Sequence, residues 1–299
     1  MTIHPGKRAA KLMLFAAALI WGSTFVFIKS SLDDVEPFFL SAMRFTIGAA
    51  CLALAGFKNL KHIDRATVKA GAVIGAHLFI AFSIQTIGVM GTTASKNAFL
   101  SSWYAALVPL LAWVFYRKPP EKRQLLAALI CVVGVGAISL SEGFGSIAWG
   151  DIVSLFAAVF YATQILATEK YGHDRDIYLI TMLEFAFAGL YGWVCNTALN
   201  GLPSFTGISS GTWFAILYLG VMASSLAFLF QNVGQIYTDP ASASLILSLE
   251  SVFGTIIAVL FYGDPLTGRL ILGFALVFLG VLYSETGFAF LKRKTGKTQ

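Results

Sequence analysis

Residues 92–116 read TTASKNAFLSSWYAALVPLLAWVFY, and this stretch gives the clearest indication of the fold. It is long and apolar enough to cross a bilayer as a helix, which takes about 20 residues. Yet it carries Lys96 and Asn97 near one end and Trp103 and Tyr104 near the middle. A charged or amide group at membrane depth is costly unless it faces protein or water. Lys96 therefore has two interpretations, a functional site or a side chain that extends to the nearby headgroups.

The whole chain shares this apolar character. Of its 299 residues, 57% are hydrophobic and 12% are charged, and the mean hydropathy is +0.77. A soluble domain has roughly 25% charged residues. The apolar runs have the length of helices, whereas strands of a membrane barrel are short and alternate in character. We therefore expect an all-α integral membrane protein whose surroundings are a lipid bilayer.

The net charge of +6 does not indicate a nucleic acid partner. The basic residues lie in the short gaps between apolar runs, where they set the orientation of a membrane protein. Cys51, Cys131 and Cys195 lie far apart within apolar runs and predict neither a disulfide nor a metal site. We find no nucleophile, metal-ligand or phosphate-binding motif, so we expect neither an enzyme nor a cofactor. The sequence leaves the oligomeric state open.

Ten apolar runs are long enough to be transmembrane helices. The predicted spans are 12–31, 37–56, 70–89, 94–116, 123–141, 149–168, 177–197, 211–236, 240–262 and 268–290. Lys and Arg are concentrated in alternate gaps, on the side of the N-terminus. This bias predicts that both termini are cytoplasmic, which an even number of spans requires.

The two halves of the chain resemble each other. With an offset of 140, Arg44 aligns with Glu184; with an offset of 146, Gln85 aligns with Gln231 and Tyr104 with Glu250. We therefore predict a first five-helix repeat over residues 1–141 and a second over 142–299, forming one membrane domain. An odd number of helices inverts the second copy. Inverted repeats place a substrate site near the midplane and operate by alternating access.

Polar and aromatic residues are concentrated within the first, third, fourth, sixth, eighth and ninth spans, which we expect to line a cavity. The candidate substrate-binding residues are Trp21, Ser23, His77, Gln85, Lys96, Asn97, Trp103, Tyr104, Tyr161, Gln164, Gln231, Asn232 and Glu250. The aromatic rings would stack on an apolar side chain, and the amides would bind a zwitterion. Lys96 would meet a carboxylate and Glu250 an ammonium group, and the two would form an opposite-charge pair.

Several of these residues have structural alternatives. Single hydroxyl groups commonly join helices, and His77 has no neighbour at metal-ligand spacing. Glu250 is either cavity-facing or an internal helix cap. We interpret Arg44 and Glu184 as structural charges that pair with helix ends or interfacial carboxylates. Lys29, at a span end, is expected to extend to the headgroups.

The chain also resembles the drug/metabolite transporter superfamily, in particular its ten-helix EamA-type exporters. The motifs are AALIWGSTFVFIK at 17–29, PFFLSAMRF at 37–45, and the stretches 92–115 and 240–282. The resemblance implies an inverted-repeat fold with a central cavity. It also implies a bacterial inner-membrane exporter of amino acids, aromatic or other neutral ones, or related metabolites.

The chain departs from this family at the ends of the fourth and ninth spans. The acidic Gly-Glu of the family is replaced there by Arg117-Lys118 and by Gly263-Asp264. Ser251 stands at the proline of the ninth span, whereas Pro109 of the fourth is retained. These differences bear on the subfamily and therefore on the substrate. Nucleotide-sugars, lipids or drug-like cations remain alternative cargoes, and a membrane-embedded enzyme is a weaker alternative without a catalytic constellation.

Overall fold

The computed structural model describes residues 6–117, 119–140, 147–172, 175–238, 246–247 and 249–287. Within these ranges the chain forms helices and connections without a strand, which confirms the predicted all-α class. Seven helices of the described residues are long and apolar enough to cross a membrane. Two shorter apolar helices, Leu249–Tyr262 and Gly268–Tyr283, accompany them.

The first half of the chain provides helices that follow the first five predicted spans. They are α1 (Lys7–Ser31), α2 (Pro37–Ala55), the 3-10 helix η1 (Phe57–His62), α3 (Arg65–Met90), α4 (Ala94–Ser102), α5 (Tyr104–Tyr116) and α6 (Lys122–Ser139).

The second half follows the remaining spans, and one of its elements is a π-helix. The elements are α7 (Trp149–Gly172), α8 (Ile177–Asn200), α9 (Ser210–Leu217), the π-helix η2 (Tyr218–Leu226), α10 (Ala227–Ile236), α12 (Leu249–Tyr262) and α13 (Gly268–Thr286).

Local chemistry sets several of these boundaries. Asp64 and Thr93 cap α3 and α4, because their side chains accept hydrogen bonds from backbone N–H groups of the first turn. Pro37 occupies the first position of α2, where its missing N–H is harmless. Arg117 ends α5 in the left-handed region with φ of 55°.

The fourth predicted span is not one continuous helix. It is divided at Trp103 into α4 and α5, and Pro109 lies inside α5. A proline lacks the N–H that the carbonyl four residues earlier would accept, so the helical ladder is already incomplete near the division. The ninth predicted span agrees with α12 only from Leu249 onward, because 239–245 and 248 lie outside the described residues.

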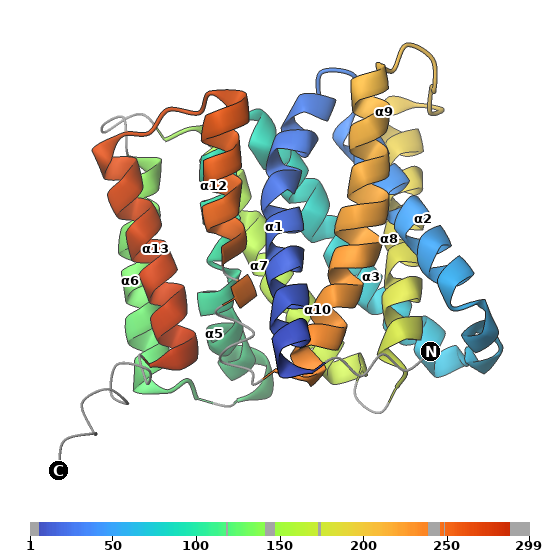
Figure 1. Ribbon diagram of the computed structural model, residues 1–299, viewed down its shortest axis with the longest axis horizontal. Coiled ribbons are helices and arrows are strands. Elements are labelled where there is room, and N and C mark those ends of the chain that lie inside the picture. The colour runs from blue at the N-terminus through green and yellow to red at the C-terminus, as the bar shows by residue number, and fades with distance from the viewer. Residues whose placement is uncertain are drawn as a thin grey trace.

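The packing of the helices is symmetric between the halves. In Figure 1, α1 lies between α12 and α10, and it packs against both. Correspondingly, α7 packs against α4, α5 and α3. The pairs α2 with α8 and α6 with α13 each join equivalent helices. Exchange of the two halves leaves this pattern unchanged, which is the packing expected of two inverted repeats.

Small residues bring α1 and α12 into close contact. A Cβ added to Gly22 would lie 2.6 Å from Phe253 Cβ and 2.8 Å from the backbone N of Gly254. Only glycine permits this approach, as is common where membrane helices pack.

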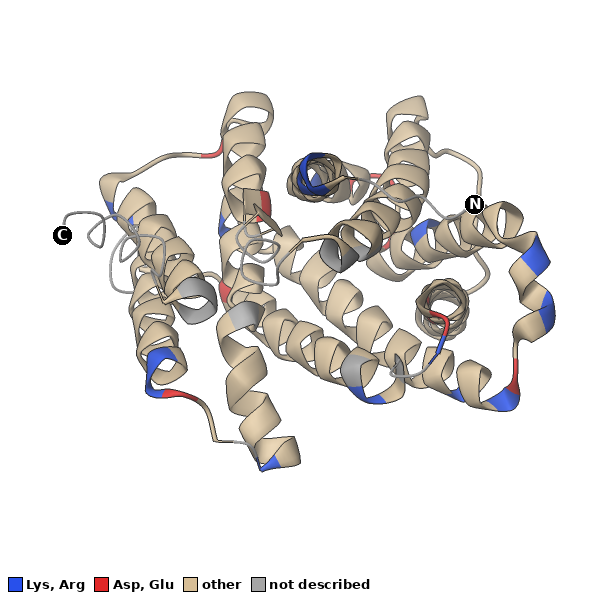
Figure 2. Cartoon of the chain, turned by 60° about the horizontal axis from the view of Figure 1, so that its bottom comes forward, with Lys and Arg blue, Asp and Glu red and all other residues tan. Residues whose placement is uncertain are grey.

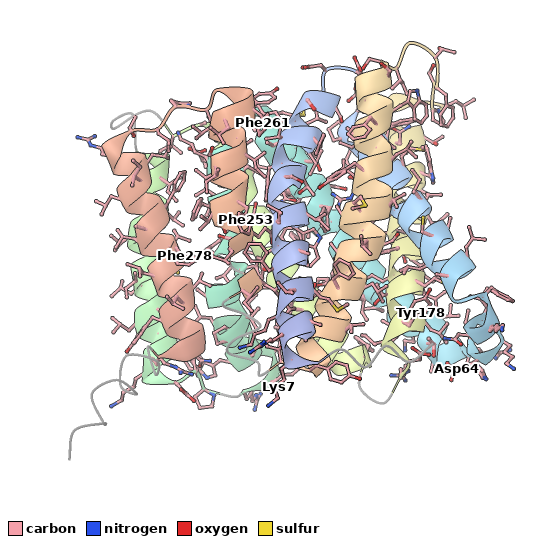
Figure 3. The ribbon with its side chains drawn as sticks, in the orientation of Figure 1. Lys7, Asp64, Tyr178, Phe253, Phe261 and Phe278 are labelled. Carbon is pink, nitrogen blue, oxygen red and sulfur yellow. The ribbon has the colours of Figure 1, made fainter. Side chains whose placement is uncertain are left out.

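Most of the described basic residues gather at one end of the bundle. This end contains the start of α1 and the connections from α2 to α3, from α5 to α6 and from α7 to α8, and Figure 2 shows it brought forward. In Figure 3, Lys7, Asp64 and Tyr178 lie at this end and Phe261 at the other. We call them the basic end and the opposite end.

Candidate functional site

Lys96 is buried at the opposite end of the bundle. It lies in the first turn of α4, and its Nζ is 4.0 Å from Asp151 Oδ2, with 6% and 0% of the two side chains exposed. Asp151 Oδ1 also accepts a hydrogen bond of 2.5 Å from Thr92 Oγ1. This carboxylate, in the first turn of α7, therefore balances the charge that made Lys96 conspicuous.

A second carboxylate closes the same end. Asp264, between α12 and α13, accepts hydrogen bonds at Oδ2 from the backbone N and the Oγ of Ser95, at 2.8 and 2.7 Å. Lys29, at the end of α1, donates from Nζ to the carbonyl of Thr92 at 2.5 Å. Lys29 thus points into the protein, and the prediction that it extends to the headgroups was wrong.

These contacts define the outer cluster, which consists of Lys29, Thr92, Ser95, Lys96, Asp151 and Asp264. It ties α1, α4, α7 and the α12–α13 connection together at one end of the bundle. Because Lys96 and Asp151 are paired in a buried setting, separating α4 from α7 would leave each charge without its partner until water reached it.

The predicted pair of Lys96 with Glu250 is not formed. Glu250 lies in the first turn of α12, and Asp264, beside Lys96, follows the far end of that helix. The 12 residues from Glu250 to Tyr262 rise about 18 Å at 1.5 Å each. Phe253, three residues after Glu250, lies between the two ends in Figure 3. Glu250 is therefore near the middle of the bundle.

Asn97 joins three helices. Its Nδ2 donates to the carbonyl of Gln85 at 3.2 Å and to Ser154 Oγ at 2.7 Å, which links α4 with α3 and α7. The repeat aligns Gln85 with Gln231, and both are candidate substrate-binding residues. The side chain of Gln85 accepts from Tyr161 OH at 2.6 Å, whereas Gln231 is partly buried on α10 and outside this contact.

Tyr161 on α7 is the centre of the mid-bundle residues. Its ring lies 5.8 Å from that of Tyr104 and 5.1 Å from that of Phe82, centroid to centroid. Arg44 lies against the same aromatic group, with its Cζ 4.4 Å from the centroid of Phe82, and both Arg44 and Glu250 lie within electrostatic range of Tyr161. We call these residues with Gln85 the central site; it takes side chains from α2, α3, α5, α7 and α12, and so from both halves.

Tyr161, Tyr104, Phe82 and Glu250 are each partly exposed although they lie within the bundle. The arrangement offers aromatic surfaces, an amide and a carboxyl group to a small molecule.

Trp21 and Ser23 lie at the interface of α1 with the π-helix. Trp21 Nε1 donates to the carbonyl of Ala223 at 2.8 Å, and Ser23 Oγ is 2.7 Å from Tyr218 OH. A π-helix changes which side chains and carbonyls face a neighbour, and such segments are frequent at functional sites. The next residue of η2, Ser224, faces Arg44 on α2.

The remaining candidates do not join the central site through a described contact. His77 Nδ1 donates to the carbonyl of Val73 one turn earlier, at 2.8 Å. Trp103 packs against the cluster of α6 and α13, and its Nε1 is buried without a hydrogen-bond partner. Gln164 donates to Glu184 Oε1 at 2.6 Å. The side chain of Asn232 lies outside the described residues.

Sequence reasoning missed Asp151, Asp264 and Ser154 as members of buried contacts. Hydropathy assigns charges near a span end to the aqueous side, so it does not indicate that Asp151 and Asp264 are buried. Their signal was the position itself, because Asp151 and Asp264 each stand near the end of a predicted span. Among the described residues, no group of three or more His, Cys, Asp or Glu side chains could hold a metal ion.

Comparison with known proteins agrees with this architecture. The sequence profile of the EamA-like transporter family matches residues 8–140 and again 148–285. An "uncharacterized transporter" of Archaeoglobus fulgidus is 34% identical over 275 residues, which cover 91% of this chain and 84% of that protein. Protein PecM of Dickeya dadantii is 23% identical over 289 residues, covering 95% and 94% of the two chains.

A solved crystal structure superimposes with a TM-score of 0.65 and 20% identity, covering 95% of this chain and 98% of that chain. At this identity the likeness concerns the fold. The profile matches both halves, in the same division that the symmetric helix packing indicates. The chain is therefore a multi-pass membrane transporter and belongs to the EamA-like transporter family.

Proposed function

We propose that this transporter exports amino acids, most of all aromatic or other neutral ones, by alternating access. The observation that carries the proposal is the composition of the central site. Two tyrosine rings, an amide and a carboxyl group meet there near the middle of the bundle, and they come from both halves.

Each group has a role in binding a small zwitterion. The rings of Tyr104, Tyr161 and Phe82 suit an aromatic or apolar side chain, which they would cover on its faces. The Oε1 of Gln85 holds Tyr161 in place and leaves the amide NH₂ for an acceptor on the substrate. Glu250 suits the ammonium group, because a carboxylate at this depth needs a cation.

The outer cluster has the properties of a gate. It closes the opposite end through contacts between the two halves, such as Lys96 with Asp151 and Ser95 with Asp264. In the proposed cycle these contacts break when the site opens to the outside, and residues 1–141 and 142–299 move against each other. The prediction that Lys96 binds substrate is thereby replaced with a role in closure.

The proposed location is the bacterial inner membrane, with both termini in the cytoplasm. The gathering of Lys and Arg at the basic end supports this orientation, since cytoplasmic connections carry an excess of basic residues. The basic end would then face the cytoplasm, and the outer cluster the periplasm.

Export from cells tests the proposal. Bacteria that express the chain are fed dipeptides, and amino acids in the medium are measured by mass spectrometry. We expect faster release of aromatic or neutral amino acids than from cells with an empty vector. Tyr161→Phe removes the hydroxyl bonded to Gln85 and should slow release several-fold. Tyr116→Phe, which loses a hydroxyl near the basic end bonded to the carbonyl of Leu166, is the control. Release equal to the empty vector for every amino acid would overturn the proposal.

A further inference from the structure

Arg44 is a buried cation without a described anionic partner. It lies on α2, and 2% of its surface is exposed. Its Nε donates a long hydrogen bond of 3.4 Å to Ser224 Oγ, and its Nη1 has no hydrogen-bond partner. In the described part of the chain no carboxylate lies within ion-pair distance of it, so the expected pairing with a helix end or an interfacial carboxylate is not observed.

Two aromatic rings offset part of the cost of burying the positive charge of Arg44. Its Cζ lies 4.4 Å from the centroid of Phe82 and 5.2 Å from that of Phe45. Such contacts contribute about 2 kcal/mol or somewhat more when desolvated. The penalty for burying an ion is several kcal/mol, and a guanidinium does not escape it by losing its proton. The described residues therefore leave the charge of Arg44 without an anion to balance it.

The described carboxylates of the protein near this depth contact residues other than Arg44. Glu184, which aligns with Arg44 in the repeat, accepts a hydrogen bond of 2.6 Å from Gln164. Glu250 interacts with Tyr161 and forms no described ion pair with Arg44. Lys96, the cation that the sequence suggested for a substrate carboxylate, is paired with Asp151 at the opposite end.

The geometry points to Arg44 as the residue that binds the carboxylate of the transported molecule, and this inference rests on the proposed function. Arg44 and Glu250 both interact with Tyr161, the centre of the site, without pairing with each other. A substrate lying across Tyr161 would supply a counter-charge to each of them. Its carboxylate would bind the free Nη1 of Arg44, and its ammonium group would bind Glu250. A guanidinium matches a carboxylate through two parallel hydrogen bonds.

The same surroundings favour a single negative charge. The guanidinium contacts Phe45, Phe82 and Ser224, and none of these described contacts brings a second positive charge. A phosphate group carries close to two charges and would require further donors of positive charge. The inferred substrate class is therefore a small monocarboxylate with an apolar or aromatic side chain.

Binding of four related compounds to the purified protein tests the inference. The probes are L-phenylalanine, L-phenylalaninamide, phenethylamine and 3-phenylpropionate, which differ in whether they have a carboxylate and an ammonium group. For the natural chain we expect L-phenylalanine to bind tighter than L-phenylalaninamide and phenethylamine, which keep the ammonium group but lack the carboxylate. Arg44→Lys keeps the positive charge but loses the planar pair of donors of the guanidinium. The affinities of the two carboxylates, L-phenylalanine and 3-phenylpropionate, should therefore fall by about tenfold or more. Affinities for the amide and the amine should stay within about twofold.

Glu184→Gln is the matched control, because it alters a buried charge at the equivalent position of the other repeat; it should leave the ranking of the four probes unchanged. An equal loss of all four probes in Arg44→Lys overturns the inference, since a structural role predicts that result. If Arg44→Lys does not fold, the natural chain decides alone: binding of L-phenylalanine that is no tighter than that of L-phenylalaninamide and phenethylamine overturns the inference. Binding of 3-phenylpropionate that depends on Arg44, with no transport of amino acids, rejects the proposed function and keeps the carboxylate site.

Discussion

At the scale of single residues, the buried Lys96 and Asp151 are tolerated because they pair with each other, each in the first turn of its helix. The carboxylate of Asp151 also accepts hydrogen bonds from Thr92 Oγ1 and the backbone N of Ala148. Breaking a buried pair by removing one partner leaves an uncompensated charge, which is more damaging than replacing both. Lys96 could be singled out from its position in an apolar run, but its partner is 55 residues away in the sequence and only the fold brings them together.

This asymmetry gives the first prediction. Asp151→Asn should lower the free energy of unfolding by about 3 kcal/mol. The double variant Lys96→Met/Asp151→Asn should recover part of that loss, because no lone charge remains. Unfolding of the purified protein in detergent, followed by tryptophan fluorescence, measures both. A double variant less stable than Asp151→Asn would contradict the pairing.

Asp34 gives a prediction on pH. It lies between α1 and α2, and its Oδ2 accepts hydrogen bonds from Ser209 and Thr212 at the start of α9. These bonds, the Ser209 hydroxyl first, lower the pKa of the Asp34 carboxyl group below its usual value. The contribution of Asp34 to the free energy of unfolding is therefore complete above the unfolded pKa of about 3.9. It is lost as the pH falls through the lower pKa of the folded state.

We expect Asp34→Asn to melt at a lower temperature than the natural chain at pH 7, with a difference that shrinks below about pH 3.9. Melting temperatures across this pH range measure the effect. Asp33→Asn removes the same charge from the same connection and serves as the control. A difference between Asp34→Asn and the natural chain that is constant with pH would show that the hydrogen bonds do not act through this carboxylate.

At the scale of elements, hydropathy predicts where helices lie but not how they are interrupted. The predicted bounds agree with the helices to within a few residues where polar groups, glycine or proline stop the apolar run, as at Pro37 and Gly201. The division at Trp103 and the π-helix η2 occur inside apolar runs, where composition does not change. They depend on which carbonyl each N–H meets, which packing determines. Pro109 is a local signal for the division at Trp103.

The contact of α1 with α12 is the element-scale prediction. A Cβ on Gly22 would meet Phe253 Cβ at 2.6 Å and the carbonyl of Glu250 at 2.9 Å. Gly22→Ala must push the helices apart and should lower the free energy of unfolding by about 1–3 kcal/mol. Gly136→Ala, on α6, meets nothing within 4 Å. It should be neutral or raise stability by up to about 1 kcal/mol through helix propensity. Equal effects of the two substitutions would contradict this packing.

At the scale of the whole molecule, the repeat was the most informative feature of the sequence. It predicted the two-repeat fold before any contact was known, because an odd number of helices requires inversion of the second half. It also aligned Tyr104 with Glu250, and both residues are in the central site. It could not reveal Arg44 as an unpaired cation, since a sequence offset carries no information on what surrounds a side chain.

The outer cluster gives a prediction about motion. In a chain whose Cys51, Cys131 and Cys195 are replaced, cysteines at Ser95 and Asp264 can be joined by a short cleavable crosslinker. The natural side chains are 2.7 Å apart, so the reaction should be efficient. We expect the crosslink to stop transport and a reducing agent to restore it, because the opposite end must open in each cycle. Each single cysteine with the same reagent is the control. Full transport by the crosslinked protein would exclude the cluster as a gate.

Counterflow in proteoliposomes tests the central claim, that the mid-bundle site carries an amino acid across the membrane. The purified chain is reconstituted, loaded with unlabelled L-phenylalanine and given a trace of labelled L-phenylalanine outside. We expect transient accumulation of label above that of protein-free vesicles, and a several-fold reduction of it in Tyr161→Phe. No accumulation for phenylalanine or any other neutral or aromatic amino acid, in vesicles that contain folded protein, would contradict the account.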